Sequence, residues 1–226
     1  MSIHDGHRQR MKRRFTEYGI DNFDDVNVLE LLLFFSNARG DTNPTAHELL
    51  NRFGSLAGVF DASPEELKKV YGIGDTSALL IKLVPQVAKR YLISKSSFSD
   101  IINSSDAAGE YLIPRFYAAK DEMVYLLCLD SKNKVIGCKL IAEGSVNSAG
   151  VSVRKIVETA LANNASSVIL SHNHTSGIAI PSTDDRITTD NIRRALSAVD
   201  IVLADHIIVA NDDYVSMADS GFFRDI

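Results

Sequence analysis

The sequence predicts an α/β domain with a mixed β-sheet, preceded by an all-α domain. Residues 1–94 carry helix start and stop signals and show little of the alternation that is typical of strands. From residue 106 onward, β-rich runs alternate with helical segments, as in a layered α/β domain. The serine-rich stretch "SKSSFSDIINSS" lies between the two patterns and offers few side chains for a core. We therefore expect domains at 1–94 and 106–226, joined by a linker at 95–105.

The first domain is expected to contain at least four helices. Pro44 lies near the start of one of them, and Gly54 acts as its stop signal. Ser63, followed by Pro64 and Glu66, predicts an N-cap with a capping box for another. The expected helices span residues 26–36, 42–54, 63–70 and 75–94.

The second domain is expected to interleave strands with helices. Helices are predicted at 105–119, 152–164 and 182–199, and strands at 122–130, 134–144, 166–172, 201–210 and 213–219. The strand at 166–172 reads as buried, and ligand sites in such sheets tend to form beyond the carboxyl end of a strand. The stretch "SHNHTSGIAIPSTDD" begins at that end.

Composition and charge narrow the class of protein. Apolar content of 45% and charged content of 23% are ordinary for a soluble globular chain, and the net charge of −5 argues against a chain that coats nucleic acid or anionic membrane along its whole length. The N-terminal residues lack the apolar core of a signal peptide, and no apolar run approaches a membrane span. We expect a cytoplasmic protein whose cysteines, Cys128 and Cys138, are reduced packing residues.

Two features of the first domain suggest contact with DNA phosphates. The run "LKKVYGIGDTSA" (67–78) fits a helix–hairpin–helix element, in which glycines permit a tight turn and the next helix opens with free N–H groups. A basic arm spans residues 8–14. The candidate DNA-binding residues are Gly72, Ile73, Gly74, Lys68, Lys69, Arg13 and Arg14. The alternative is a purely structural connector and a solvated helix face, since Asp75 competes with phosphate at the helix start.

The stretch at 171–185 predicts a metal site. His172 and His174 are two residues apart and would point the same way from a strand end. Imidazole pairs suit Zn²⁺, Asp185 can supply a third ligand, and three protein ligands leave a fourth position open, as in catalytic sites. The alternative for Ser182 and Asp185 is a capping box without any metal.

These residues resemble a known family. The pattern His172-x-His174, seven residues, Ser182, two residues, Asp185 is that of the JAMM motif of MPN-domain metallopeptidases. The fuller run resembles the bacterial RadC branch, as do "DEMVYLLCLDSKNKVI", "EGSVNSAGVSVRKIVETAL", "ADHIIV" and "YVSMAD", together with N-terminal segments such as "DTNPTAHELLNRFGSL". One departure is visible, because RadC proteins usually carry proline where this chain has Thr175. That change should loosen the loop but removes no ligand.

The resemblance implies a fold, a cofactor and roles. The fold would be a JAMM/MPN-type mixed sheet with flanking helices, preceded by the helix–hairpin–helix domain. His172, His174 and Asp185 would hold one zinc per chain, and Ser182 would steady the bound water or the oxyanion. A glutamate on an early strand would be the general base; Glu122 is favoured over Glu143, and the choice stays open.

The implied activity is hydrolysis of a peptide or isopeptide bond. RadC proteins are traditionally labelled DNA-repair factors, so the competing hypothesis is a non-catalytic DNA-binding accessory protein with a structural or vestigial metal site. Cleavage of phosphodiesters is a third reading that no motif supports. Zinc deaminase and His-Glu-x-x-His patterns fail, the latter because Asn51 replaces the second histidine. Asp205 and His206 either support the metal ligands from behind or form an ordinary hydrogen-bonded pair in a strand.

Overall fold

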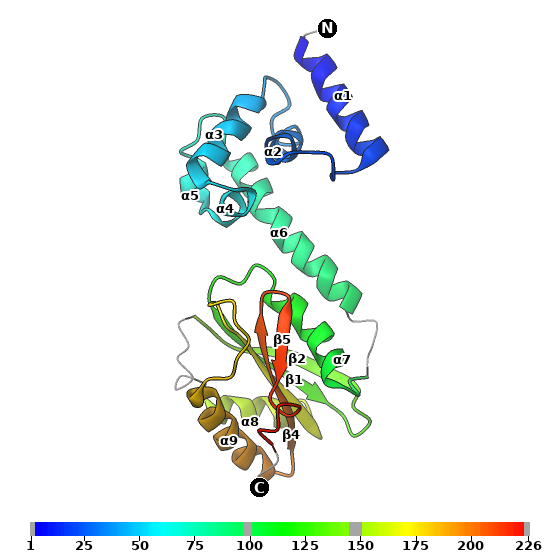
Figure 1. Ribbon diagram of the computed structural model, residues 1–226, viewed down its shortest axis with the longest axis vertical. Helices are drawn as coiled ribbons and strands as arrows, with labels where there is room; N and C mark the ends of the chain where they lie inside the picture. The colour runs from blue at the N-terminus through cyan, green and yellow to red at the C-terminus, as the bar shows by residue number, and fades with distance from the viewer. Residues whose placement is uncertain (1–2, 97–100, 145–150, 224–226) are drawn as a thin grey trace. The chain divides into compact units, whose positions relative to one another are not determined.

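The chain divides into two compact units. A computed structural model describes residues 3–96, 101–144 and 151–223 (Figure 1). The units are Met1–Ala88 and Lys89–Ile226, so the division falls inside one helix, α6 (Asp75–Ser96). Of the predicted linker at 95–105, residues 97–100 lie outside the described residues. Ile102 already belongs to the second unit, where it is buried.

The N-terminal unit is all-helical, as predicted. Ser63 and Glu66 form the expected capping box, and Gly54 ends its helix in the left-handed region with φ of 81°. The helices are α1 (Ile3–Tyr18), α2 (Asp25–Leu33), α3 (Asn43–Phe53), α4 (Leu56–Asp61), α5 (Pro64–Leu67) and the first part of α6. Helix α5 ends short of the predicted Val70 because the chain turns there into the glycine hairpin. Leu29, Leu49 and Ile81 are fully buried in the core of this unit.

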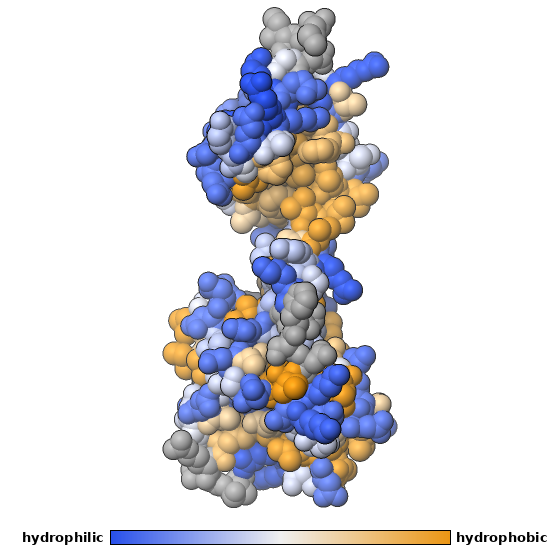
Figure 2. Space-filling model, turned by 90° about the vertical axis from the view of Figure 1, so that its right-hand side faces the viewer, coloured by the Kyte–Doolittle hydropathy of each residue, from blue (hydrophilic) through white to orange (hydrophobic). Residues whose placement is uncertain are grey.

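Apolar side chains also gather on one outer face of the N-terminal unit (Figure 2). Phe15, Ile20 and Phe35 are among the exposed large apolar residues. They line a cavity of about 390 Å³ together with residues of α2 and with Val84 of α6.

The C-terminal unit is built on a five-stranded mixed sheet with the strand order β2-β1-β3-β4-β5. The strands are β1 (Glu122–Leu129), β2 (Val135–Gly144), β3 (Ser167–Asn173), β4 (Val202–Ala210) and β5 (Asp213–Ser216). Strands β3 and β4 run parallel, and the other neighbours run antiparallel. The mixed sheet with flanking helices is the fold class that the sequence predicts.

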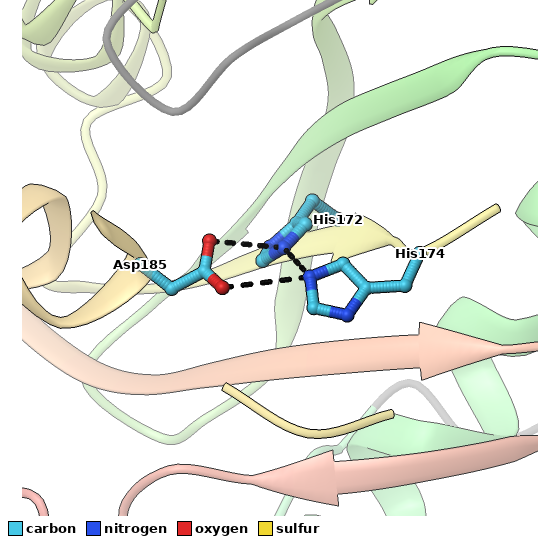
Figure 3. Close-up of side chains that lie close together, drawn as sticks. All are labelled: His172, His174 and Asp185. Carbon is cyan, nitrogen blue, oxygen red and sulfur yellow. Dashed lines mark hydrogen bonds and ion pairs between the residues drawn. The ribbon is translucent and has the colours of Figure 1, made fainter. Parts of the chain in front are cut away.

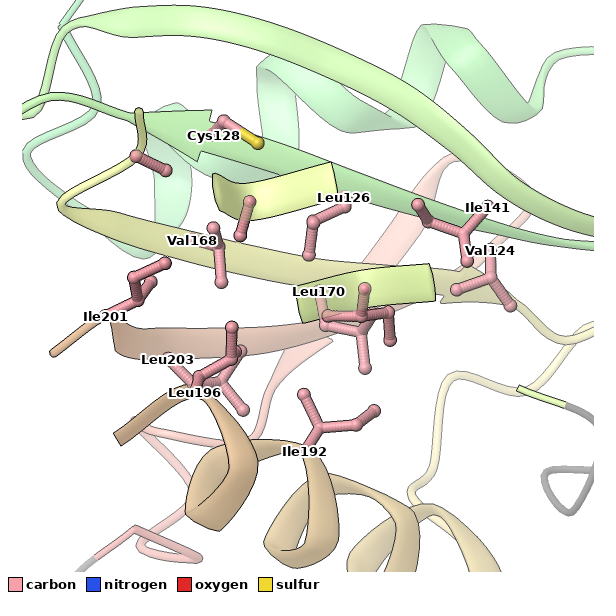
Figure 4. Packing of buried hydrophobic residues seen from close by; sticks show 13 residues of the cluster. Val124, Leu126, Cys128, Ile141, Val168, Leu170, Ile192, Leu196, Ile201 and Leu203 are labelled. Carbon is pink, nitrogen blue, oxygen red and sulfur yellow. The ribbon is translucent and has the colours of Figure 1, made fainter. Parts of the chain in front are cut away.

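Helices cover both faces of the sheet (Figure 1). Helices α8 (Val153–Ala162) and α9 (Thr183–Ser197) pack on one face, where Leu126, Leu170 and Ile192 are among the fully buried residues of the core (Figure 4). Helix α7 (Ser105–Leu112) packs on the other face. The helix predicted at 105–119 gives way to a 3₁₀ turn after Leu112, because Pro114 has no N–H to continue the α-helical pattern.

The two cysteines are free thiols, as predicted. Cys138 lies opposite Leu127 and shares its face of the sheet. Cys128 is the next residue after Leu127 and points to the other face, so the two thiols lie on opposite faces of the sheet. Cys128 belongs to the core under α8 and α9, and Cys138 packs against the core under α7. Among the described residues, no helix is long and apolar enough to cross a membrane.

Candidate metal centre

The end of strand β3 sends consecutive side chains to opposite faces of the sheet. His172 lies opposite Val124 of β1, on the face that α8 and α9 cover. Asn173 points the other way and ties down the start of β1: its Oδ1 accepts a hydrogen bond from Met123 N at 2.7 Å, and its Nδ2 donates to Asp121 O at 3.2 Å. The N–H of His174 donates to Val209 O of β4 at 2.8 Å. The end of β3 is therefore hydrogen-bonded to both neighbouring strands, β1 and β4.

Three side chains converge on one point beside β3 (Figure 3). The Nε2 atoms of His172 and His174 are 2.9 Å apart. His172 Nε2 lies 3.2 Å from Asp185 Oδ1, and His174 Nε2 lies 3.4 Å from Asp185 Oδ2. His172 and Asp185 are buried, and His174 is partly buried. The structure thus brings together the three residues that the sequence offers as candidate metal ligands.

The arrangement fits a metal ion. His174 Nδ1 lies 3.0 Å from the carbonyl oxygen of Ile178, which can only accept, so Nδ1 carries the proton and Nε2 presents a lone pair. A tetrahedral zinc ion with ligands at ~2.05 Å has edges of roughly 3.3 Å between ligand atoms. The observed separations of 2.9, 3.2 and 3.4 Å are close to that edge. A nitrogen and oxygen set of this kind suits zinc, and the identity of the metal stays a prediction.

Asp185 caps its helix and faces the cluster at the same time. Its Oδ2 accepts hydrogen bonds from Ser182 N at 2.8 Å and Ser182 Oγ at 2.6 Å, and Asp185 N donates to Ser182 Oγ at 3.1 Å. Burial alone would raise the pKa of the Asp185 carboxyl, but the hydrogen bond that a protonated His172 donates and the donors of Ser182 outweigh burial and hold the pKa well below its ordinary value. The two sequence interpretations, cap and ligand, are therefore compatible in one residue.

Two more polar residues lie behind the cluster. His206 Nε2 of β4 is 2.8 Å from His172 Nδ1, and His206 Nδ1 is 2.6 Å from Thr189 Oγ1. Complete burial lowers the pKa of His206 well below its ordinary value, and the neighbouring His172 lowers it further. Sequence reasoning had not singled out Thr189. The available signal was its position four residues after Asp185, which places both on one side of α9.

The two candidate general bases lie in different surroundings. Glu122 lines a cavity of about 330 Å³ that also takes in the histidine–aspartate cluster and Ser182. It is two residues before Val124, the residue opposite His172, so the pleat of β1 gives Glu122 the same face as the cluster. Glu143 is exposed and lies opposite Met123, whose side chain belongs to the core on the other face. Only Glu122 of this pair lines that cavity.

The loop after His174, where this chain has Thr175, closes in a turn at Gly177. Gly177 N donates to His174 O at 3.3 Å, and Gly177 takes a φ of 82° that favours glycine. The bond between His174 and the Ile178 carbonyl closes the same turn from the side chain. A backbone hydrogen bond and a side-chain hydrogen bond thus close this loop, and its rigidity stays a prediction.

Ile73 anchors the glycine hairpin in the core of the N-terminal unit. Ile73 is buried, while Gly72 and Gly74 are exposed. Gly72 has a φ of 88°, and a Cβ there would meet Thr45 Oγ1 at 2.6 Å. Asn37, in the segment that follows α2, donates from Nδ2 to Gly72 O at 3.1 Å and so also holds the hairpin.

The basic candidates for DNA contact are partly engaged within the chain. Arg14 donates to Asn22 O and lies over the ring of Phe23. Lys68 pairs with Asp75 at 3.1 Å on the surface. Two further candidates, Arg13 and Lys69, have exposed side chains, and Arg13 reaches Glu17 only at 3.8 Å.

Fold and cluster together define a mixed α/β domain with a His–His–Asp site of metal-binding type. A family model described as a RadC-like JAB domain matches residues 102–222. The UPF0758 protein PSHAa2643 of Pseudoalteromonas translucida is 35% identical over 94% of this chain and 95% of its own length. The UPF0758 protein FN0909 of Fusobacterium nucleatum is 34% identical over 96% of each chain. The chain belongs to the RadC family, as the motif resemblance predicts.

Proposed function

We propose that this protein is a zinc-dependent hydrolase of the JAMM class that cleaves a peptide or isopeptide bond. The observation that carries the proposal is the convergence of His172, His174 and Asp185 at tetrahedral spacings inside a cavity that Glu122 also lines. An acid beside three ligands is the arrangement that hydrolysis by an activated water needs. Zinc in this site would supply Lewis acidity and lower the pKa of a water molecule to about 7.

The residues of the chain have separable tasks in this scheme. Glu122 takes a proton from the attacking water, whose oxygen bonds to the carbonyl carbon of the substrate. Glu122 then delivers that proton to the leaving nitrogen as the carbon–nitrogen bond breaks. Ser182, at the N-cap of α9, hydrogen-bonds the oxyanion that develops on the carbonyl once its hydroxyl turns away from Asp185 Oδ2. Because Asp185 remains charged far below neutral pH, it is ready to serve as a ligand.

A matched pair of variants tests the catalytic assignment. Glu122→Gln should lower hydrolysis by about 10²–10⁴-fold and leave the zinc content at about one per chain, because the base is not a ligand. Glu143→Gln, the same change on the exposed neighbouring strand, should leave both unchanged. Mass spectrometry gives the zinc content, and fluorogenic peptide and isopeptide libraries give the activity.

Other outcomes point to the competing readings. Loss of activity only in Glu143→Gln would move the base to that residue. Zinc-loaded protein that cleaves no member of either library, but binds DNA, would favour the accessory protein with a structural or vestigial metal site. Nicking of DNA by zinc-loaded protein would indicate phosphodiester chemistry instead.

A second proposed activity is DNA contact by the N-terminal unit. It is supported by the hairpin at Gly72–Gly74, where the N-terminal end of α6 opens beside exposed backbone. A Cβ added at Gly74 would meet no atom within 4 Å, so Gly74→Glu should leave the fold intact and repel phosphate. Binding by the full chain should fall steeply with salt, show little sequence preference and weaken in this variant. Undetectable binding at low salt would refute the proposal.

We further propose that the protein works in the cytoplasm. The support is that Cys128 and Cys138 are free thiols on opposite faces of the sheet and so cannot form a disulfide with each other. Fractionation of cells that express the full chain with a fluorescent tag tests this placement.

A further inference from the structure

A chain of short hydrogen bonds runs behind the histidine–aspartate cluster from one candidate ligand to another. It begins at the backbone carbonyl of Asp185, passes through Thr189 Oγ1 and both ring nitrogens of His206, and ends at His172 Nδ1. The three separations are 2.6, 2.6 and 2.8 Å. Thr189 and His206 are 3% and 2% exposed, so water does not compete for these bonds.

The donor and the acceptor of each bond follow from the Asp185 carbonyl at which the chain of bonds begins. The Asp185 carbonyl can only accept, so two oxygens 2.6 Å apart require the single hydroxyl proton of Thr189 to lie between them. The sulfur of Met217 is a weaker acceptor and lies farther away, at 3.6 Å. With its proton committed, the Thr189 hydroxyl can only accept from His206, whose Nδ1 therefore carries a proton.

The same logic carries on to the metal ligand. When His206 is neutral and protonated on Nδ1, its Nε2 is an acceptor. His172 Nδ1 must then be the donor of the 2.8 Å bond between the two rings. The remaining nitrogen, His172 Nε2, holds a lone pair that points at His174 and Asp185. The direction fixed at one carbonyl thus determines which nitrogen of His172 is free.

We propose that Thr189 and His206 are positioning residues that lock His172 in the tautomer needed for metal binding. This inference rests on the proposed function, because a tautomer lock matters only where Nε2 is a ligand. Metal-bound histidines usually donate their second N–H to a carbonyl or a carboxylate, and loss of such a partner weakens metal binding by about 10–100-fold. Here an imidazole takes that place and is itself oriented by a hydroxyl.

The test uses isosteric changes in the full chain. Thr189→Val removes the hydroxyl at nearly constant volume, and Thr189→Ser restores it. Thr159→Val is the control, because Thr159 Oγ1 makes the same bond to the carbonyl four residues back, Lys155 O at 2.7 Å, but as an exposed bond at which no hydrogen bond to a histidine is seen among the described residues. His206→Gln, which offers an amide oxygen to His172, is compared with His206→Leu, which offers nothing.

Two readouts separate positioning from folding. Long-range ¹H–¹⁵N spectra of metal-free protein should show His172 protonated on Nδ1, and Thr189→Val should mix in the other tautomer. Zinc affinity, measured by competition with a chelating dye, should fall about 10–100-fold in Thr189→Val and His206→Leu. It should recover in Thr189→Ser and stay largely intact in His206→Gln and in Thr159→Val.

The contrary outcomes are distinct. Wild-type His172 protonated on Nε2, or zinc affinities of Thr189→Val and Thr159→Val that agree, would overturn the positioning role while leaving the zinc site standing. Wild-type protein that binds no zinc would overturn the proposed function, and the tautomer lock would lose its purpose with it.

Discussion

Replacing Asp185 with asparagine should separate its two tasks, because only one of them needs a charge. The amide oxygen of Asp185→Asn can still accept hydrogen bonds from Ser182 N and Ser182 Oγ, so the start of α9 stays capped. A neutral amide is a poor ligand for zinc, whose usual oxygen ligands are carboxylates. We therefore expect the variant to fold nearly normally and to lose most of its affinity for zinc.

The expected size of the effect follows from ligand linkage. Free zinc at 100 times the wild-type Kd stabilises the native state by about 2.7 kcal/mol. For a unit the size of Lys89–Ile226, each kcal/mol shifts Tm by about 4 °C, so wild-type Tm should rise by about 11 °C. If Asp185→Asn weakens binding a thousandfold, the same zinc concentration adds only about 0.06 kcal/mol. The altered cap itself should cost no more than about 1 kcal/mol in metal-free protein.

Scanning calorimetry measures the Tm of the full chain for wild type and for Asp185→Asn, each once with zinc and once with chelator. Ser182→Ala is the useful contrast, because it damages the cap by about 0.5–2 kcal/mol but keeps the carboxylate. It should lower Tm in both states and retain most of the zinc-dependent rise. A full rise of about 11 °C in Asp185→Asn would refute the assignment of Asp185 as a ligand, and the capping box would be its whole role.

Four further predictions concern the fold around the site. Leu126→Ala, at a fully buried position under α8 and α9, should lower the free energy of unfolding by about 2–5 kcal/mol in urea titrations, whereas a cost below about 1 kcal/mol would show that the core there is loosely packed. Burial raises the pKa of Cys128 to about 11, so at pH 8 only about one thiol in a thousand is ionised and a thiol reagent should label Cys128 only after unfolding. Limited proteolysis should cut within 95–105 and release a folded, metal-binding C-terminal fragment, and a fragment without metal would count against two independent domains. Gly72→Val should lower Tm, because its φ of 88° is strained for valine and the added Cβ meets Thr45 Oγ1 at 2.6 Å.

The meeting of the three candidate ligands was predictable from sequence because its geometry is local. His172 and His174 are fixed by the period of one strand, and Asp185 by the first turn of the next helix, so short-range rules suffice. The capping signature at Ser182 pointed to the same helix start. The fold class followed from alternating strand and helix signals in the same way.

What sequence reasoning left open depends on register and strand order. Glu122 and Glu143 are both strand-end acids, and only the pairing of β1 with β2 and with β3 distinguishes their faces. A register shift between Val124 and Tyr125 in the pairing of β1 with β2 makes the face of Glu143 hard to count from sequence. Likewise, His206 reaches His172 because β4 lies parallel beside β3, a neighbour relation that no local pattern encodes. Non-local contacts of this kind are set by the packing of the whole sheet.

Side chains at the end of β3 alternate between the two faces of the sheet, so the candidate site depends on whether the number of inserted or deleted residues is odd or even. His172 belongs to the histidine–aspartate cluster and Asn173 hydrogen-bonds the start of β1, so consecutive residues serve opposite faces of the sheet. Inserting or deleting a single residue within β3 would exchange these faces, placing an imidazole against β1's backbone and an amide among the ligands. The same slip would detach the strand that carries Glu122 from its anchor. Only insertions or deletions of an even number of residues in β3 would therefore keep His172 and Asn173 on their present faces. Single substitutions at exposed positions of the domain do not change these faces.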